Sequence, residues 1–209
     1  MTEIWESSFL ENQMMWGFEP ADSAILAKDF FLEKKVGNLL IPGIGYGRNA
    51  KVFIDNGIEV TGIEISKSAI ELARENGLNI PIYHGSVSDM PFDQKLYAGI
   101  FSYALIHLLN REEREKFLQD CYNQLLPNGY MIFTTISKEA PMYGKGKQLG
   151  KDYFEITEGM KLFFYDHETI KQDFGQYGLL EISEVLEPHK HAESKPPFPF
   201  LMVKCQKVK

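Results

Sequence analysis

Three glycines at every second position are the residues of this sequence that most directly suggest chemistry. Gly43, Gly45 and Gly47 follow an apolar run in the stretch LLIPGIGYGRN, and Glu64 lies 21 residues beyond the first of them. Glycine lets the backbone turn sharply and approach a ligand without obstruction by a Cβ atom. A helix that begins directly after the turn directs unpaired backbone N–H groups toward the same place. A carboxylate at the end of the next strand can accept hydrogen bonds from both hydroxyls of a ribose, so the pair of features predicts a cofactor site.

The elements that must position these residues follow from the alternation of apolar runs and amphipathic segments. We expect strands at residues 36–41, 58–65, 81–87, 97–105 and 130–136, and helices at residues 22–34, 48–56, 67–75 and 110–126. A short strand at 161–165, a helix at 167–177 and two last strands at 179–186 and 200–206 complete the chain. Strands that alternate with helices form parallel sheets with right-handed crossovers, so the expected fold is α/β and doubly wound, with helices on both faces. The last two strands are expected to pair as an antiparallel hairpin on the sheet edge.

Two segments lie outside this alternation. Residues 1–35 begin with a high density of aromatic side chains, including Trp16, and we expect them to pack across the site as a cover, although a Trp16 buried as a core anchor is an equally good interpretation. Residues 138–160 are rich in glycine and lysine and are longer than a usual connection, which predicts a lid-like loop. In this loop Tyr143 and Tyr153, with the lysines at positions 138, 145, 147 and 151, could recognise an anionic or aromatic acceptor, although a solvated flexible loop is at least as good an interpretation.

Composition limits the class of partner. The chain has 209 residues with 44% hydrophobic and 13% aromatic residues, which suffices for the core of one domain, residues 1–209. A net charge of −7 disfavours a broad basic surface for nucleic acid or anionic lipid. The sequence begins without a basic region followed by an apolar run and holds no apolar run long enough to span a bilayer. With Cys121 and Cys205 expected to be buried thiols, we predict a cytoplasmic protein with no nucleic-acid or membrane partner.

The glycine spacing separates two kinds of cofactor turn. A dinucleotide-binding fingerprint, GxGxxG, would place its third glycine at position 48, which is Arg48, whereas the observed spacing is GxGxG. At this point the sequence resembles the class I S-adenosylmethionine-dependent methyltransferases, over nearly the whole chain. The resemblance implies a Rossmann-like, seven-stranded, mostly parallel sheet with a reversed last strand. It also implies S-adenosylmethionine as the cofactor.

The resemblance also implies site residues. In that family the glycine turn holds the methionine part of the cofactor and the acid ending the second strand binds the ribose. The segment HGSVSDMPF resembles the stretch whose acid contacts adenine, which assigns Asp89, and FSYALIHLL resembles the fourth strand that passes under the cofactor. The expected cofactor-binding residues are therefore Trp16, Gly43, Gly45, Gly47, Arg48, Asn49, Glu64, Ile65, Ser66, Val87, Ser88, Asp89, Met90, Ser102, Tyr103, Ala104 and His107.

Departures from the family pattern point to one branch. Ile41 stands where many relatives have an acid, and the IPGxGxG form is similar to thiopurine or thiol methyltransferases and to tellurite-resistance-type relatives. The Asp-Pro-Pro-Tyr motif of enzymes that methylate DNA bases or amide nitrogens is replaced by FSYA. A small-molecule methyl acceptor is expected, bound by Trp16, Tyr143 and Tyr153, in a monomer or homodimer. Whether oxygen, nitrogen or sulfur is methylated stays open.

Catalysis by positioning and desolvation leaves the need for a base open. Methyl transfer is an in-line displacement, and a base is required only if the acceptor is protonated. His107 is the weak candidate for that base, since a histidine after this strand also serves structural roles. The other histidines lack companion ligands at metal spacing, so no metal is expected. The alternatives are an NAD-type nucleotide-dependent oxidoreductase and a non-catalytic S-adenosylmethionine-binding module.

Overall fold

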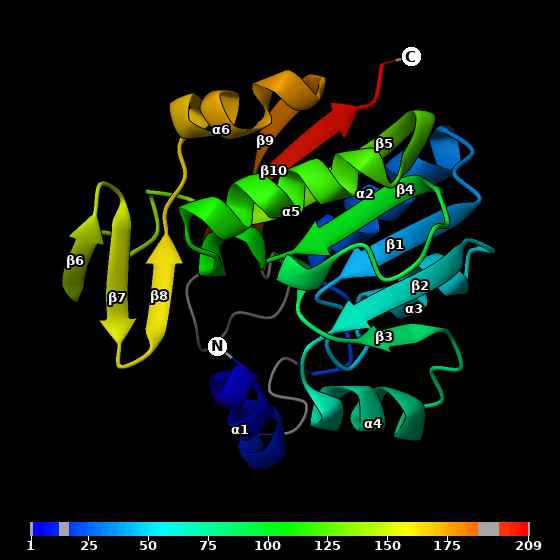
Figure 1. Ribbon diagram of the computed structural model, residues 1–209, viewed down its shortest axis with the longest axis horizontal. Helices are drawn as coiled ribbons and strands as arrows, with labels where there is room; N and C mark the ends of the chain where they lie inside the picture. Colours follow the sequence, from blue (N-terminus) through cyan, green and yellow to red (C-terminus); the bar gives the residue numbers. More distant parts are fainter. Residues whose placement is uncertain (1, 13–16, 188–196, 209) are drawn as a thin grey trace.

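The computed structural model describes residues 2–12, 17–187 and 197–208 (Figure 1). Its helices are α1 (Thr2–Asn12), α2 (Asp22–Glu33), α3 (Ala50–Ile54), α4 (Lys67–Glu75), α5 (Arg111–Asn123) and α6 (His167–Phe174), with short 3₁₀ turns η1 (Val87–Asp89), η2 (Ile106–Leu108) and η3 (Gly175–Tyr177). Its strands are β1 (Asn38–Pro42), β2 (Glu59–Glu64), β3 (Ile82–His84), β4 (Tyr97–Tyr103), β5 (Leu125–Ile136), β6 (Lys147–Gly150), β7 (Tyr153–Thr157), β8 (Met160–Phe163), β9 (Leu179–Glu187) and β10 (Phe198–Gln206). The expected alternation of strands and helices is therefore present as far as β5.

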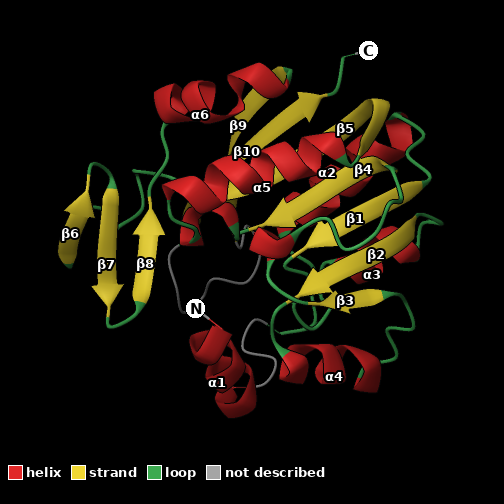
Figure 2. Cartoon of the chain, viewed as in Figure 1, coloured by secondary structure: helices red, strands yellow, loops and turns green. Residues whose placement is uncertain are grey.

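A seven-stranded sheet in the order β3-β2-β1-β4-β5-β10-β9 forms the centre of the fold (Figure 2). The first five of these strands run parallel, and β10 pairs antiparallel with both β5 and β9. The predicted doubly wound, mostly parallel sheet with an antiparallel C-terminal pair is confirmed. The strand order changes direction between β1 and β4, and ligands bind at such a switch point in open α/β sheets.

Helices cover both faces of this sheet. Successive side chains on a strand point to opposite sides, so apolar residues on both faces must be buried. On β1, Leu40 packs in the cluster that contains Phe117 of α5 and Phe174 of α6. Its neighbour Leu39 packs instead in the cluster that contains Phe31 of α2 and Phe53 of α3. Figure 2 shows α5 on one side of the strands and α2 and α3 on the other. Burial on two faces explains the nearly continuous apolar runs of the parallel strands.

Helix starts agree with the sequence where a side chain caps them. Ser66 accepts a hydrogen bond from Ala69 N at 3.1 Å, and α4 spans the predicted residues 67–75. Asn110 and Glu113 form a reciprocal capping box at the start of α5. Two other elements are shorter than predicted: α3 begins at Ala50 rather than at position 48, and β3 ends at His84.

The end of α5 corrects one prediction. The helix was expected to reach residue 126 and to stop at Pro127-Asn128-Gly129, but it ends at Asn123, and β5 begins at Leu125. Asn128 adopts a left-handed φ of 64° and donates its N–H to Lys207 O at 3.0 Å. The turn residues therefore lie inside a long, irregular strand that pairs with the chain after β10, a long-range contact that local signals do not report.

The structure of residues 138–160 also differs from the prediction. They were expected to form a loop, but β6, β7 and β8 form a separate three-stranded antiparallel sheet at one side of the molecule (Figure 1). Phe154 of β7 and Leu162 of β8 are buried against Ile136 at the end of β5. Lys138 also holds this sheet in place, since its Nζ lies 2.7 Å from an Asp152 carboxylate oxygen. Whether the segment acts as a lid stays a prediction.

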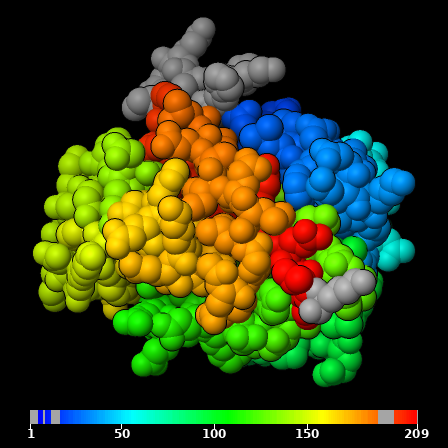
Figure 3. Space-filling model, turned by 90° about the horizontal axis from the view of Figure 1, so that it is seen from above, coloured from blue at the N-terminus to red at the C-terminus, as the bar shows by residue number. Residues whose placement is uncertain are grey.

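The other face of the molecule brings distant segments together. Figure 3 shows β9, coloured orange, beside the blue residues of the N-terminal third. The contact is made by Glu187 at the end of β9, which accepts hydrogen bonds from the backbone N–H of Ser23, at 2.8 Å, and from its hydroxyl. Glu187 is buried, and it supplies the cap that the start of α2 lacks locally.

We predict that Gly178→Ala destabilises the protein by at least ~2 kcal/mol more than Gly77→Ala does. Both glycines have positive φ, 73° and 80°, so alanine costs about 1–2 kcal/mol at either position. A Cβ at position 178 would lie 2.0 Å from Gln206 O in β10, whereas none at 77 meets an atom within 4 Å. Urea unfolding monitored by circular dichroism measures the difference, and equal losses for the two variants would contradict it.

Candidate cofactor and acceptor site

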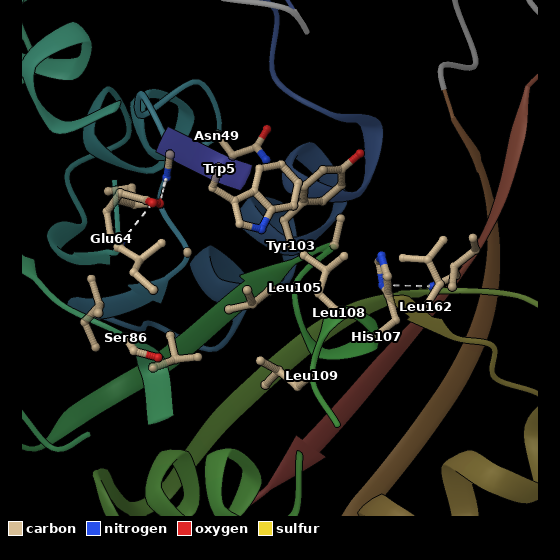
Figure 4. A pocket seen from close by; sticks show the side chains of 18 of the residues that line it. Trp5, Asn49, Glu64, Ser86, Tyr103, Leu105, His107, Leu108, Leu109 and Leu162 are labelled. Atoms are coloured by element: carbon tan, nitrogen blue, oxygen red, sulfur yellow. Dashed lines mark hydrogen bonds between the residues drawn. The ribbon is translucent and has the colours of Figure 1, made fainter. Parts of the chain in front are cut away.

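A cavity of about 560 Å³ lies at the carboxyl ends of β1, β2 and β4 (Figure 4). Its volume falls in the range of roughly 300–1,000 Å³ that is typical of small-molecule sites. The described residues that line it are Trp5, Phe9, Gly43, Ile44, Gly45, Tyr46, Arg48, Asn49, Ile63, Glu64, Ile65, Gly85, Ser86, Val87, Tyr103, Ala104, Leu105, His107, Leu108, Leu109, Glu113, Ile136, Met142, Met160, Leu162, Phe198 and Phe200. In Figure 4 Glu64 and Ser86 lie at one end and His107 and Leu162 at the other, with Trp5 and Tyr103 between them.

The glycine turn forms one wall and needs glycine for conformational and steric reasons. Gly43, Gly45 and Gly47 all have positive φ, at 71°, 58° and 84°. A Cβ at Gly47 would lie 2.3 Å from a Leu78 methyl carbon, so this glycine serves packing behind the turn, outside the cavity lining. Gly43 and Gly45 face the cavity.

Glu64 fixes the turn from the neighbouring strand. Its Oε2 accepts the N–H of Gly45 at 2.8 Å, and its Oε1 accepts the N–H groups of Ile65 and Ser66 at 2.8 and 2.9 Å. Burial raises the pKa of the Glu64 carboxyl, and the three N–H bonds oppose that rise. Two carboxylate oxygens offer about four acceptor positions, and the three N–H bonds use three of them, which leaves one on Oε2.

Helix α1 covers the polar end. Trp5 and Phe9 on α1 line the cavity, and the Phe9 ring centroid lies 6.2 Å from that of Tyr46 in the glycine turn. Glu6 anchors the helix, because its carboxylate accepts hydrogen bonds of 2.6 Å from both the Ser66 and Ser68 hydroxyls at the start of α4. Ser66, the cap of α4, therefore bonds to Glu64 through its N–H and to Glu6 of α1 through its hydroxyl.

Residues 17–21 cross the glycine turn on its outer side. Tyr46 donates its hydroxyl to Gly17 O at 2.7 Å, and Asn49 accepts the N–H of Ala21 at 2.9 Å through its side-chain oxygen. The Arg48 guanidinium lies 5.7 Å from the centroid of the Tyr103 ring. Arg48 and Asn49, predicted to contact the cofactor, thus line the cavity while also holding this segment in place.

Tyr103 is fixed under the middle of the cavity. Its hydroxyl donates to Glu187 Oε2 at 2.5 Å, the same carboxylate that caps α2. Burial is the largest cause of a pKa for Tyr103 raised above its ordinary value, and the Glu187 carboxylate adds to it. The ring of Tyr103 lies 5.9 Å from that of Phe200 and leads into the apolar end.

His107 is the polar residue set most deeply at the far end. Its Nδ1 accepts the backbone N–H of Ile136 at 3.3 Å and lies 3.5 Å from the Thr135 hydroxyl. Burial lowers the pKa of His107 to about 3, so the ring is uncharged at neutral pH. The surrounding surface is apolar and comes from four distant segments, represented by Met142, Leu162 and Phe200 together with Leu108.

The predicted site residues divide into three groups. Those that line the cavity are Gly43, Gly45, Arg48, Asn49, Glu64, Ile65, Val87, Tyr103, Ala104 and His107. Those placed outside its lining are Gly47, Ser66, Ser88, Asp89, Met90, Ser102, Tyr143 and Tyr153. Trp16 lies outside the described residues, so its predicted roles stay predictions. Asp89 is exposed in η1, whereas Ser86, three residues earlier, faces the cavity.

Sequence reasoning missed the contributions of α1 and of β8 and β10. Trp5 and Phe9 belong to the aromatic-rich N-terminal segment. A cover over the site was predicted for this segment, but helix α1 was not. Met160, Leu162, Phe198 and Phe200 gave only a general apolar signal. Within the described ranges, no three His, Cys, Asp or Glu side chains gather as metal ligands. In the same part of the chain, the helices are too short or too polar to cross a membrane.

Comparison with known sequences gives a consistent family. A profile of the family described as "Methyltransferase domain" matches residues 40–129. An uncharacterized methyltransferase of Staphylococcus carnosus is 24% identical over 147 residues, 68% of this chain and 70% of that protein. The tRNA N(3)-methylcytidine methyltransferase Mettl2 of Drosophila melanogaster is 22% identical over 77% of this chain, but the match spans only 52% of its own length.

Solved structures give the same fold. The 1,6-didemethyltoxoflavin-N1-methyltransferase of Burkholderia thailandensis, with bound 1,6-didemethyltoxoflavin and S-adenosylhomocysteine, superimposes with a TM-score of 0.76 at 15% identity, covering 100% of this chain and 87% of that one. A structure concerning the conversion of a disulfide bond into a thioacetal group during echinomycin biosynthesis has a TM-score of 0.76 at 16% identity, covering 100% and 92%. At these identities the likeness establishes the fold.

We predict that His107 makes the protein less stable in mild acid. The unfolded chain takes up a proton near pH 6.5, whereas the folded His107 does so only near its pKa of about 3, so stability falls as pH drops between these values. From pH 7 to 5 this amounts to about 2 kcal/mol. Urea unfolding at both pH values should show a smaller loss for His107→Asn, whose side-chain oxygen can still accept from Ile136 N–H. An equal loss in the two proteins would refute the assignment.

Proposed function

This chain belongs to the class I S-adenosylmethionine-dependent methyltransferases, and we propose that it transfers the cofactor's methyl group to a small-molecule acceptor held at the apolar end of the cavity. The observation that carries the proposal is the division of one cavity into two ends. One end has the buried carboxylate of Glu64 beside the glycine turn, and the other is apolar around His107. When bound, S-adenosylmethionine supplies an electrophilic methyl group on a positively charged sulfur.

The residues of the polar end fit that cofactor. Glu64 lines the cavity and retains one acceptor position for a ribose hydroxyl, and Gly43 and Gly45 let the backbone come close to the methionine part. Ser86 and Val87 face the place expected for adenine, and we assign them this role in preference to Asp89. Trp5 on α1 covers the cofactor, a role that the sequence suggested for Trp16.

A small acceptor is favoured over a macromolecule. Helix α1 and residues 17–21 cover the polar end, and the β6–β8 sheet contributes Met160 and Leu162 to the other, so the covered cavity suits a ligand of small-molecule size. The net charge of −7 opposes binding to RNA, which the Drosophila relative modifies. The toxoflavin relative carries a small heterocycle beside S-adenosylhomocysteine, in keeping with this choice.

We also retain two proposals about the protein's setting. The free, buried thiols of Cys121 and Cys205 suit a reducing compartment, and we propose the cytoplasm. We propose a monomer or homodimer as the assembly, which light scattering after size-exclusion chromatography would decide. Neither proposal affects the chemistry of the cavity.

Calorimetric titration tests the proposed function against its alternatives. S-adenosylmethionine and S-adenosylhomocysteine should bind and NAD should not, because Arg48 stands where a dinucleotide turn needs a third glycine. Mass spectrometry of a panel of small thiols, amines and N-heterocycles incubated with S-adenosylmethionine should then find a methylated product. Binding of NAD in place of S-adenosylmethionine would support the oxidoreductase, and cofactor binding without any product would support the non-catalytic module.

We predict that Glu64→Gln weakens S-adenosylmethionine binding at least ~10-fold, whereas Asp89→Asn leaves it within about twofold. The first variant replaces a charged acceptor with an amide whose NH₂ group opposes backbone donors, and a hydrogen bond to a charged group is worth about 1.5–3 kcal/mol. The second changes a carboxylate outside the cavity lining. Dissociation constants from calorimetry, with thermal unfolding as a check on folding, measure both. A larger effect at Asp89 than at Glu64 would reverse the assignment.

A further inference from the structure

We propose that His107 is a specificity-determining residue. It presents an uncharged Nε2–H donor to the acceptor, which is an aromatic small molecule carrying a hydrogen-bond-accepting atom such as a ring nitrogen. This inference rests on the proposed function, because it names the substrate class of the same cavity. It differs from the role of general base that the sequence suggested for this residue.

The hydrogen bond at the other ring nitrogen determines the position of the proton. The backbone N–H of Ile136 can only donate, so the Nδ1 that accepts it at 3.3 Å must be unprotonated. An uncharged imidazole with a bare Nδ1 carries its proton on Nε2. The pKa lowered to about 3 by burial is consistent with an uncharged ring. At neutral pH the lone pair of His107 is therefore occupied, and the ring can donate but not take up the acceptor's proton.

The donor has no partner among the described residues, and His107 lines the cavity. Nε2 lies on the ring edge opposite the bond to Ile136, and in Figure 4 His107 lies beside Leu108 and Leu162 at the end remote from Glu64. No described residue accepts a hydrogen bond from Nε2. A ligand that carries an accepting atom can pair with this donor, whereas a hydrocarbon ligand of the same shape would leave it unpaired.

The surroundings of this donor favour an aromatic ligand. The Phe200 ring centroid lies 6.4 Å from that of His107 and 5.4 Å from that of Phe198. Met142 and Met160 contribute thioether groups, which make favourable contacts with aromatic rings. A flat aromatic ligand with one accepting atom would therefore satisfy both the apolar walls and the single donor.

Two other ionisable side chains, Glu113 and Tyr103, line the cavity and already have partners. Glu113 accepts the Asn110 N–H at 2.8 Å, and the Tyr103 hydroxyl donates to Glu187. Because the Nδ1 lone pair of His107 is occupied, this histidine does not serve as the base, and an acceptor whose nucleophilic atom needs no deprotonation suits the site. Thiolates and unprotonated ring nitrogens meet this condition, whereas a neutral alcohol is a weak nucleophile that must lose its proton.

Matched probes and variants test the donor. Binding of quinoline, isoquinoline and naphthalene is measured by calorimetry in saturating S-adenosylhomocysteine. The three probes have the same shape and differ in one ring nitrogen. We expect the better of the two nitrogen heterocycles to bind the native protein about two- to tenfold tighter than naphthalene, the factor of one net hydrogen bond.

The variants His107→Asn and His107→Gln distinguish the role of Nδ1 from that of Nε2. Asparagine places an oxygen near the position of Nδ1 and keeps the contact with Ile136, but it has no donor at the position of Nε2. The longer glutamine places its NH₂ group near that position. The heterocycle preference should disappear in His107→Asn and persist in part in His107→Gln. Phe200→Leu is the control for shape, and it should weaken all three probes without changing their ratio.

The outcomes distinguish this inference from the proposed function. Failure of S-adenosylhomocysteine to bind the native protein would overturn the proposed function. Normal cofactor binding with a heterocycle preference retained in His107→Asn would overturn only the role of His107. As a second readout, ¹⁵N-histidine NMR should place the proton of His107 on Nε2 and show that resonance moving with the favoured heterocycle but not with naphthalene. A proton on Nδ1 would also overturn the inference.

Discussion

The hydrogen bonds of the Glu64 carboxylate are the interaction on which the rest of the site depends. Three backbone N–H groups from Gly45, Ile65 and Ser66 converge on it, and they join the turn after β1 to the end of β2 and the cap of α4. A buried carboxylate is tolerated only when its charge is compensated in this way. The Ser66 hydroxyl extends the network to Glu6 and so to α1. One acidic side chain thus shapes the cofactor wall and, through one further residue, positions its cover.

The parts of this arrangement that are local in sequence could be predicted. The glycine turn, Glu64 and the cap at Ser66 are each defined by a few neighbouring residues, and the strand–helix alternation predicted the sheet in which they lie. Asp89 was assigned because the resembling family segment has an acid at the adenine, and Ser86 was not among the predicted residues. The short turn η1 decides which of them faces the cavity, and its orientation depends on packing such as that of Val87.

The apolar end could not be predicted because its parts are far apart in the chain. Met142, Leu162 and Phe200 come from three segments that meet only after β10 inserts between β5 and β9. The same long-range pairing explains why β5 begins at Leu125, since Lys207 beyond β10 bonds to Asn128 and Gly129. Hydrophobic patterning identifies residues that will be buried, but not which distant residues they will contact.

The two ends therefore differ in how they serve the reaction. The polar end uses backbone groups and a carboxylate that are organised before any ligand binds, so little reorganisation is needed there. The apolar end offers few polar groups to hold water beside a bound ligand, and its deepest polar residue is held uncharged. A charged imidazolium would lie in the same cavity as a cationic sulfonium, and two like charges in poorly solvated surroundings repel strongly. A neutral histidine whose Nδ1 is held by Ile136 avoids that repulsion while still offering a directional hydrogen bond. The bond between His107 and the end of β5 therefore matters to the chemistry because it orients a donor without introducing a charge.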